Sequence, residues 1–394
     1  MNPNSVFECV ADTYSRLPVI MVRGKGTRLY DDKGREYLDF TSGIAVCNLG
    51  HCHEDLVDVA KAALNHVWHT SNLFWTRPQG LLARALCERS FGEKVFFCNS
   101  GAESVEAAFK LMRRFGRETK GPHATEVIAL DGSFHGRTLG ALSLTGQPRF
   151  QKDFRPLVQT VTFVPRNDIE SLRLAIGRRT CGVMLEPIQG EGGIHELDPE
   201  YLEEVRSLCH ENGLLLCFDE VQVGIGRTGH LFAYQGVGVE PDLMCLAKAL
   251  GNGLPIGALV GKEKYMSFLP PGTHASTFGG NPVIASVAHK VVELMGEPGF
   301  LEDVRAKGER LKGGLLELKA EFPSIIAEVR GRGLILAVEL RHPLKGMAEM
   351  FMKQGVLVMA PYDRLLRCLP PLVITNGEID EFLETARRIF KAWA

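Results

Sequence analysis

The chain has 394 residues, of which 45% are hydrophobic and 23% charged, and its 45 basic and 47 acidic residues leave a formal net charge of -2. This length exceeds what a single hydrophobic core normally supports, so we expect two domains. The near-neutral charge gives no reason to expect binding to nucleic acid or to an acidic membrane surface, and the composition is typical of a soluble metabolic enzyme.

Cysteine usage and the absence of long apolar runs indicate a cytoplasmic protein. The ten cysteines form no C-x-x-C pair, and several lie inside apolar runs, where a free thiol behaves as a small hydrophobic residue. The first 18 residues contain acids and no apolar segment of the kind found in a secretory signal. No run approaches the roughly 20 apolar residues of a membrane span.

The N-terminal part of the chain predicts a β-hairpin. The segment "RLYDDKGREYLDF", residues 28–40, consists of two strand-like pieces around the turn Asp32-Lys33-Gly34. A small sheet is therefore expected near the N-terminus.

The centre of the chain, from Glu93 to Glu263, alternates short apolar runs with helical periodicity. A helix is expected from Ala102, and another over 198–213, where Pro199 begins the helix and Gly213 ends it. Strands are expected at 94–98, 126–130, 160–164, 181–186, 214–218, 243–246 and 256–261. Strands that alternate with helices predict an α/β domain whose sheet is mostly parallel and covered on both faces.

The C-terminal part predicts a mixture of helices and strands. Pro282 is well placed to begin a helix that continues to Met295, and the segment "IIAEVRGRGLILAVEL" reads as strands. We expect residues 46–290 to form the large domain, and residues 1–45 and 291–394 to form a smaller domain together.

Gly224, Gly226 and Gly229 spell the G-x-G-x-x-G pattern of dinucleotide-binding proteins, but the pattern is misplaced. That fingerprint needs its first glycine at the end of a strand and a helix at the third. Here the strand ends near Asp219, five residues too early, and the segment after Gly229 lacks a helical period. A nicotinamide oxidoreductase is therefore a distant alternative.

Two charged residues follow buried strands and suggest a ligand site. Asp219 lies at the end of one predicted strand, and ligands of open α/β sheets bind outside the carboxyl ends of strands. Lys248 follows another, among Ala247, Ala249 and Leu250, where crowding disfavours the ammonium form and favours the nucleophilic amine of Schiff-base chemistry. A loop carboxylate and a lysine extended to solvent remain the alternatives.

Two more strand ends carry polar groups. Ser100 and Gly101 begin a predicted helix, whose free N–H groups could hold a phosphate, although an ordinary helix cap explains them equally well. The loop after residue 130 brings together Phe134, His135 and Arg137, which could also be a satisfied histidine and a surface arginine.

A phosphate cradle, an aromatic ring, a carboxylate and a lysine, in this order, meet the needs of pyridoxal 5'-phosphate (PLP). At these motifs the sequence resembles the class III aminotransferases over nearly its whole length, through "NSGAESVEAAFK", "GSFHGRTLGALSLTG", "EPIQGEGG", "FDEVQVGIGRTG", "LAKALGNGLPIGA", "STFGGNP" and "LRCLPPLVIT". The resemblance implies the PLP-dependent transferase fold of type I, an α/β fold with a large, mostly parallel-sheet domain and a smaller α+β domain.

The resemblance also implies roles around the cofactor ring. Lys248 would bind PLP covalently and then act as general acid and base. Asp219 would pair with the pyridine nitrogen, and Gln222 with the phenolic oxygen, while Val221 and Phe134 would enclose the ring.

The phosphate site and the assembly follow from the same resemblance. Ser100, Gly101 and Ala102 would hold the phosphate, although many relatives have threonine where this chain has Ala102. Family enzymes complete the site with a Ser-Thr pair from the neighbouring subunit, matched here by Ser276 and Thr277, which implies a homodimer with active sites at the interface.

For substrates, the resemblance assigns three further residues. Arg137 would bind a carboxylate of the donor or the distal carboxylate of 2-oxoglutarate, and Arg367 the α-carboxylate, with Glu191 able to pair with Arg367. Similarity is greatest to the acetylornithine type, which implies transfer of the δ-amino group of N2-acetyl-L-ornithine to 2-oxoglutarate in arginine biosynthesis. Ornithine, succinyl-diaminopimelate and 4-aminobutyrate remain alternative donors.

Two remaining features receive plainer interpretations. The "HCH" run at 51–53 has no companion cluster with zinc-type spacing, so we expect no metal. Trp68, Phe74 and Trp75 are expected at a dimer interface or in the wall of the active site rather than in a surface for nucleic acid.

Overall fold

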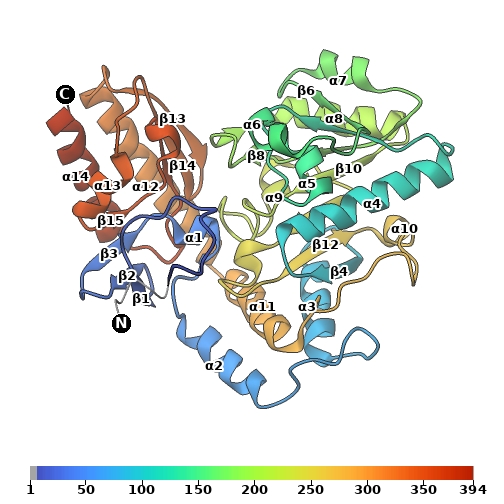
Figure 1. Ribbon diagram of the computed structural model, residues 1–394, viewed down its shortest axis with the longest axis horizontal. Coiled ribbons are helices and arrows are strands. Elements are labelled where there is room, and N and C mark those ends of the chain that lie inside the picture. Colours follow the sequence, from blue (N-terminus) through green and yellow to red (C-terminus); the bar gives the residue numbers. More distant parts are fainter. Residues whose placement is uncertain (1–6, 394) are drawn as a thin grey trace.

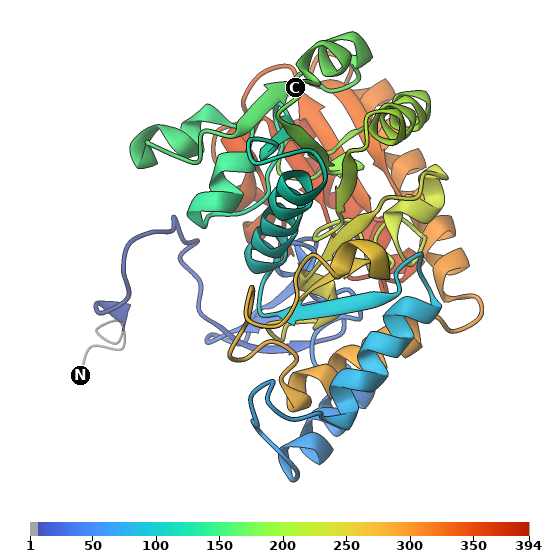
Figure 2. The ribbon, with the colours of Figure 1, turned by 90° about the vertical axis from the view of Figure 1, so that its right-hand side faces the viewer.

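The computed structural model describes residues 7–393, and it separates the middle of the chain from its two ends (Figure 1). The middle forms a seven-stranded sheet with helices on both faces. The N-terminal and C-terminal parts lie together on the other side of the molecule. The segment that precedes the first strand extends away from the body of the protein (Figure 2).

The large sheet has the strand order β4-β12-β11-β10-β7-β5-β6. Every pairing is parallel except those of β12, which is antiparallel to both neighbours, β11 and β4. Because β11 reaches β12 through a short connection without a crossover helix, the chain can only return antiparallel. The strands are β4 (Lys94–Cys98), β5 (Glu126–Leu130), β6 (Val161–Val164), β7 (Thr180–Leu185), β10 (Leu215–Asp219), β11 (Leu243–Leu246) and β12 (Gly257–Gly261).

Helices cover both faces of this sheet, as the apolar strands require. Alternate residues of β5 point to opposite faces, so Val127 and Ala129 pack under α4 (Gly101–Thr119) while Ile128 and Leu130 pack under α8 (Pro199–Glu211). The α4 face expected from its periodicity is the buried one, since Val105, Ala108, Phe109 and Met112 are all within 2% of full burial. The helix begins at Gly101, one residue before the expected start, because Ser100 caps it.

Three further helices pack together against β4, β11 and β12. They are α2 (Glu54–Leu64), α3 (Arg77–Glu88) and α11 (Pro282–Met295). Pro282 occupies the first turn of α11 as expected, where its missing N–H costs no hydrogen bond.

The two ends of the chain build two smaller sheets. The expected hairpin is β2 and β3, with Gly34 at φ +76° in its turn. The first sheet has the order β1-β2-β3-β15 and the second β13-β14-β16. Their strands are β1 (Met21–Lys25), β2 (Arg28–Asp31), β3 (Glu36–Asp39), β13 (Ile326–Arg332), β14 (Ile335–Leu340), β15 (Val356–Leu357) and β16 (Leu365–Cys368).

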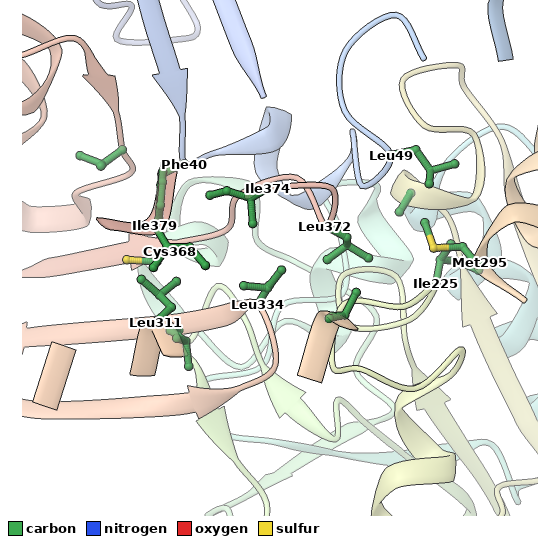
Figure 3. Close-up of a cluster of buried hydrophobic side chains, with 14 of the residues drawn as sticks. Phe40, Leu49, Ile225, Met295, Leu311, Leu334, Cys368, Leu372, Ile374 and Ile379 are labelled. Atoms are coloured by element: carbon green, nitrogen blue, oxygen red, sulfur yellow. The ribbon is translucent and has the colours of Figure 1, made fainter. Parts of the chain in front are cut away.

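Side chains from both ends share one hydrophobic cluster (Figure 3). The rings of Phe40 and Phe382 stack with their centroids 3.9 Å apart. Ile225 and Met295 join the same cluster from the central part of the chain. The domain limits expected from the sequence, 46–290 and the two ends, remain a prediction.

The remaining elements are short connectors or flank the smaller sheets. They are α1 (Ser42–Ala45), α5 (Leu139–Leu144), α6 (Pro148–Gln151), η2 (Lys152–Phe154), α7 (Ile169–Ala175), β8 (Ile188–Gln189), β9 (His195–Glu196), α9 (Ala233–Val237), η3 (Lys248–Leu250), α10 (Glu263–Met266), α12 (Phe300–Glu321), α13 (Met347–Lys353), η4 (Pro361–Asp363) and α14 (Asn376–Trp393). Within residues 7–393, no helix is long and apolar enough to cross a membrane.

Candidate active site

The carboxyl ends of the parallel strands surround a cavity of about 610 Å³. Loops after β4, β5, β7, β10 and β11 all contribute to its wall, in agreement with the rule that ligands bind at this edge of an open sheet. Most of the residues singled out from the sequence line it, namely Ser100, Gly101, Ala102, Phe134, Arg137, Glu191, Asp219, Val221, Gln222 and Lys248.

Lys248 follows β11 and is the first residue of η3. Its φ is +45°, a left-handed conformation that is uncommon for residues other than glycine and that tight packing must hold in place. Burial lowers the pKa of its amine from the ordinary value, and the charge of Arg367 acts in the same direction, whereas Glu191 opposes both. The neutral amine, which can act as a nucleophile or a base, is therefore easier to reach than in an exposed lysine.

Asp219 is the last residue of β10 and is held by a histidine. Its Oδ2 lies 2.7 Å from Nδ1 of His135, and its Oδ1 accepts a hydrogen bond from the Val221 amide at 3.0 Å. Burial disfavours the charged imidazole, but the hydrogen bond and charge of Asp219 outweigh it, so the pKa of His135 is raised. The pair therefore fixes the Asp219 carboxyl group in the wall of the cavity.

A second buried carboxyl group was missed in the sequence. Glu186 follows β7, accepts hydrogen bonds from the amides of Phe134 (2.8 Å) and Gly190 (3.2 Å), and lines the cavity. Burial raises its pKa to about 7, and nearby Asp219 adds to the effect while His135 opposes it. The signal that could have identified it is the one used for Asp219, an acidic residue immediately after a buried strand.

The start of α4 provides a place for an anionic group. Ser100 Oγ accepts a hydrogen bond from the Glu103 amide at 3.2 Å, so the serine does cap the helix, and its hydroxyl can still donate. A Cβ atom at Gly101 would lie 2.6 Å from Cγ1 of Val221, so only glycine fits there. With the first-turn N–H groups lacking helical acceptors, this end of the cavity suits a phosphate.

Arg367 and Glu191 form an ion pair at the wall of the cavity, which Glu191 lines. Arg367 comes from β16 and is 1% exposed; its Nη1 donates to Glu191 Oε1 at 2.9 Å. Gln222 joins both, because its amide nitrogen donates to Glu191 (3.1 Å) and its oxygen accepts from Arg367 (3.1 Å). Burial raises the pKa of Glu191, but Arg367, Lys248 and the hydrogen bond from Gln222 together outweigh it, so the pKa is lowered.

Arg137 lies at the mouth of the cavity beside aromatic rings. Its guanidinium carbon is 3.9 Å from the ring centroid of Phe150 and 5.6 Å from that of Phe134. Stacking of this kind orients a guanidinium while leaving its N–H groups available for an anion.

The predicted Ser-Thr pair is placed differently from the other site residues. Ser276 accepts a hydrogen bond from the Asn99 side chain at 3.1 Å, next to the start of α4. Thr277 is exposed and borders a separate small recess, so it does not line the cavity of its own chain. Its predicted service to a partner subunit remains a prediction. Trp68 and Trp75 are 65% and 97% exposed, and their interface role also remains a prediction.

The glycines that resembled a dinucleotide fingerprint form a turn-rich loop after β10. Gly226 and Gly229 have φ values of +85° and +83°, and the helix that follows, α9, starts only at Ala233. The sequence had not indicated this five-residue helix. Because it does not start at the third glycine, Gly229, the loop lacks the helix that a dinucleotide fingerprint requires. For residues 7–393, no group of three or more histidine, cysteine or acidic side chains has the arrangement of a metal site.

Comparisons with known proteins agree with this geometry. The family model described as aminotransferase class-III matches residues 9–390. The acetylornithine aminotransferase of Caldanaerobacter subterraneus subsp. tengcongensis is 48% identical over 376 residues, which cover 95% of each chain.

Two solved structures extend the similarity to the fold. The N-acetylornithine aminotransferase from Stenotrophomonas maltophilia K279a has a TM-score of 0.84 and 35% identity, and the match covers 99% of both chains. The ornithine aminotransferase from Toxoplasma gondii, described as having partial occupancy of PLP at its active site, has a TM-score of 0.93 and 32% identity over 98% of this chain and 92% of that one.

Proposed function

Since the chain belongs to the class III aminotransferase family, we propose that it transfers the δ-amino group of N2-acetyl-L-ornithine to 2-oxoglutarate, giving N-acetylglutamate 5-semialdehyde and glutamate. The α/β fold is that of PLP-dependent aminotransferases, as expected from the resemblance. Acetylornithine aminotransferases are among its similar relatives and solved neighbours, and this supports the choice of donor.

The cavity fits the cofactor that the family uses. It offers a buried amine at Lys248, a carboxyl group held by His135 at Asp219 and a helix start shaped for a phosphate at Gly101. When bound, PLP supplies the electron-withdrawing ring that makes a proton on the reacting carbon removable. We propose that Lys248 binds the cofactor and that Phe134 and Val221 enclose its ring.

The chain's own groups then have distinct tasks. Asp219, held in place by its hydrogen bond with His135, would pair with the pyridine nitrogen of the cofactor. The amine of Lys248, whose pKa is lowered, takes a proton from the reacting carbon of the substrate and returns it. The walls formed by β-strand ends exclude bulk water, and so strengthen each of these electrostatic interactions.

The ion pair between Glu191 and Arg367 is the single observation that carries the choice of an ω-amino donor. A donor whose reacting carbon bears no carboxylate leaves Arg367 without a substrate partner, and Glu191 neutralises it. 2-Oxoglutarate and glutamate bring an α-carboxylate that competes with Glu191 for Arg367. Arg137 is then free to bind the other carboxylate of either substrate.

We further propose that the enzyme is a cytoplasmic homodimer serving arginine biosynthesis. Ser276 and Thr277 of the partner subunit would complete each phosphate site. Two observations support this assembly: Thr277 faces away from its own cavity, and Trp68, Leu73, Phe74 and Trp75 form an exposed apolar segment nearby.

The decisive experiment ranks kcat/KM for acetylornithine, ornithine, succinyl-diaminopimelate and 4-aminobutyrate with 2-oxoglutarate as acceptor. We expect acetylornithine to lead ornithine and 4-aminobutyrate by at least about ten-fold. A preference for ornithine or another donor would replace the proposed substrate within the same chemistry.

The role of Lys248 is tested separately. Borohydride reduction of the holoenzyme should attach the cofactor to the peptide that contains Lys248, as seen by mass spectrometry. Lys248→Ala should lose at least about a hundred-fold in kcat because the general acid-base group is gone. A variant that keeps its turnover would contradict the assignment, and Lys262→Ala, at a surface lysine that pairs with Glu240, is the matched control.

A further inference from the structure

Phe150 carries a guanidinium group from each of two arginines. The guanidinium carbon of Arg137 lies 3.9 Å from the ring centroid, and that of Arg149 lies 4.5 Å from it. Arg149 also stacks on Tyr362, at 4.6 Å, although Tyr362 belongs to η4 in the C-terminal part of the chain. Two cations on one phenyl ring repel each other, and such an arrangement suits an anion placed between or beside them.

Arg149 lacks an acidic partner in the described part of the chain. Its Nη2 donates to Gln147 Oε1 at 2.5 Å, and no carboxylate of residues 7–393 lies within 4.0 Å of the guanidinium. Its neighbour Arg364 differs, because Arg364 Nη2 lies 3.5 Å from Glu339 Oε1. Partial burial and the charge of Arg137 lower the pKa of Arg149 while Glu191 opposes them, which reflects an incompletely balanced positive charge.

Arg149 lines a second cavity that neighbours the active-site cavity. This cavity has a volume of about 620 Å³ and is also lined by His195, Tyr362 and Arg364. Glu191 lines both cavities, so the two lie side by side. Arg137 lines the first and Arg149 the second, and both stack on Phe150.

Tyr362 has a backbone conformation that points to a maintained contact. Its φ is +60°, and that of Asp363 is +54°, in a three-residue helical turn where Tyr362 is 66% exposed and its two neighbours are half-buried. Two successive left-handed residues other than glycine are costly and persist only when their surroundings hold them. Their effect here is to place an aromatic ring over Arg149 and so to restrict its guanidinium.

The chemistry of the donor indicates what this cation recognises. In an ornithine acylated at its α-nitrogen, that nitrogen is attached to the carbon that also bears the carboxylate assigned to Arg137. The acyl tail therefore emerges next to Arg137, whose stacking ring, Phe150, also carries Arg149. An acetyl group ends there in a methyl, which offers Arg149 nothing, whereas an acyl group that ends in a carboxylate offers a charge-assisted hydrogen bond.

We propose that Arg149 is a further specificity-determining residue, which binds a carboxylate at the free end of the donor's acyl group. This inference rests on the proposed function, because it takes the donor to be an amino acid that is acylated at its α-nitrogen, reacts at its ω-amino group and binds Arg137 through its carboxylate. Arg149 accordingly favours succinyl-type over acetyl-type donors, and Tyr362 holds it in position.

The test compares two donors that differ only at the acyl end, N2-succinylornithine and N2-acetylornithine. In Arg149→Gln, the ratio of kcat/KM for the succinyl donor to that for the acetyl donor should fall about ten-fold, the size of one charged hydrogen bond. Arg364→Gln removes the same charge from the same cavity and should leave the ratio within about two-fold of the wild type. Arg149→Lys should fall between them, because it keeps the charge and loses the planar fork.

A binding measurement separates recognition from turnover. Calorimetric titration of the holoenzyme with N-succinyl-L-norvaline and N-acetyl-L-norvaline, which lack the reacting amine, should show tighter binding of the succinyl compound. That preference should disappear in Arg149→Gln, and thermal unfolding of the variant should match the wild type.

Equal binding of the two norvaline compounds by the wild type would overturn the inference, as would an unchanged donor ratio in Arg149→Gln. A wild-type enzyme that turns over neither acyl donor would instead overturn the proposed function.

Discussion

Replacing Glu191 with glutamine tests how one active site accepts two kinds of substrate. The change keeps the shape of the side chain but removes the charge that faces Arg367, which is 1% exposed and 2.9 Å away. Hydrogen bonds between charged groups contribute about 1.5 to 3 kcal/mol, or roughly ten-fold to a hundred-fold in an equilibrium constant. Because the Glu191 side chain is 27% exposed, we expect the lower part of this range.

The two half-reactions should respond in opposite directions. With the ω-amino donor, Arg367 is left without a counter-charge in a buried site, so kcat/KM should fall about ten-fold. With glutamate, the α-carboxylate no longer competes with Glu191, so kcat/KM should hold or rise. Stopped-flow measurement of each half-reaction under single-turnover conditions gives the two values independently.

The control is Glu328→Gln, which removes a carboxylate that pairs with Arg330 on the far side of the second cavity. It should leave the ratio of the two half-reactions within about two-fold. If Glu191→Gln slowed both half-reactions by the same factor, the ion pair would be a structural feature and the reasoning from it would be refuted.

Two further predictions follow from the site and its support. Gly101→Ala should weaken PLP retention about ten-fold or more, measured by dialysis and absorbance, because the new Cβ would lie 2.6 Å from Val221. Adding Val221→Ala should restore part of the retention. If it does not, the contact with Val221 is not the cause of the loss. Burial lowers the pKa of His51, but Asp39, whose Oδ2 lies 2.7 Å from His51 Nε2, and Cys47 together outweigh it and raise this pKa to about 10, above its ordinary 6.5. Its contribution to stability is therefore complete below about pH 6.5 and lost as the pH rises towards 10. The urea midpoint of the wild type should decline over this range, and that of His51→Gln should decline less steeply. Equal declines in the two proteins would contradict this reasoning.

Local patterns carried much of the prediction. An apolar run followed by a polar residue identified Asp219 and Lys248, because the carboxyl ends of parallel strands share one edge of the sheet. The same rule applied to β7 would have found Glu186. The periodicity of α4 predicted its buried face, although the cap at Ser100 moved its start by one residue.

Other features depend on residues that are far apart in the sequence. Arg367 and Glu191 are separated by 176 positions, and His135 and Asp219 by 84, yet each pair is in contact and has at least one member in the wall of the cavity. The resemblance suggested the first pair, but no local pattern indicated the second. Arg149 and Tyr362 likewise meet only because the C-terminal part of the chain packs beside the loops of the large sheet.

The sequence by itself therefore determined the class of the fold, the strand ends that carry chemistry and the family to which the chain belongs. These depend on short-range periodicity and on residue types at fixed spacings, which the linear chain contains. The tertiary structure alone decided that His135 faces Asp219, how closely Gly101 approaches Val221, and that Arg149, which has no acidic partner among residues 7–393, stacks on the same ring as Arg137. Such contacts arise from the docking of separate layers, whose register no local pattern encodes.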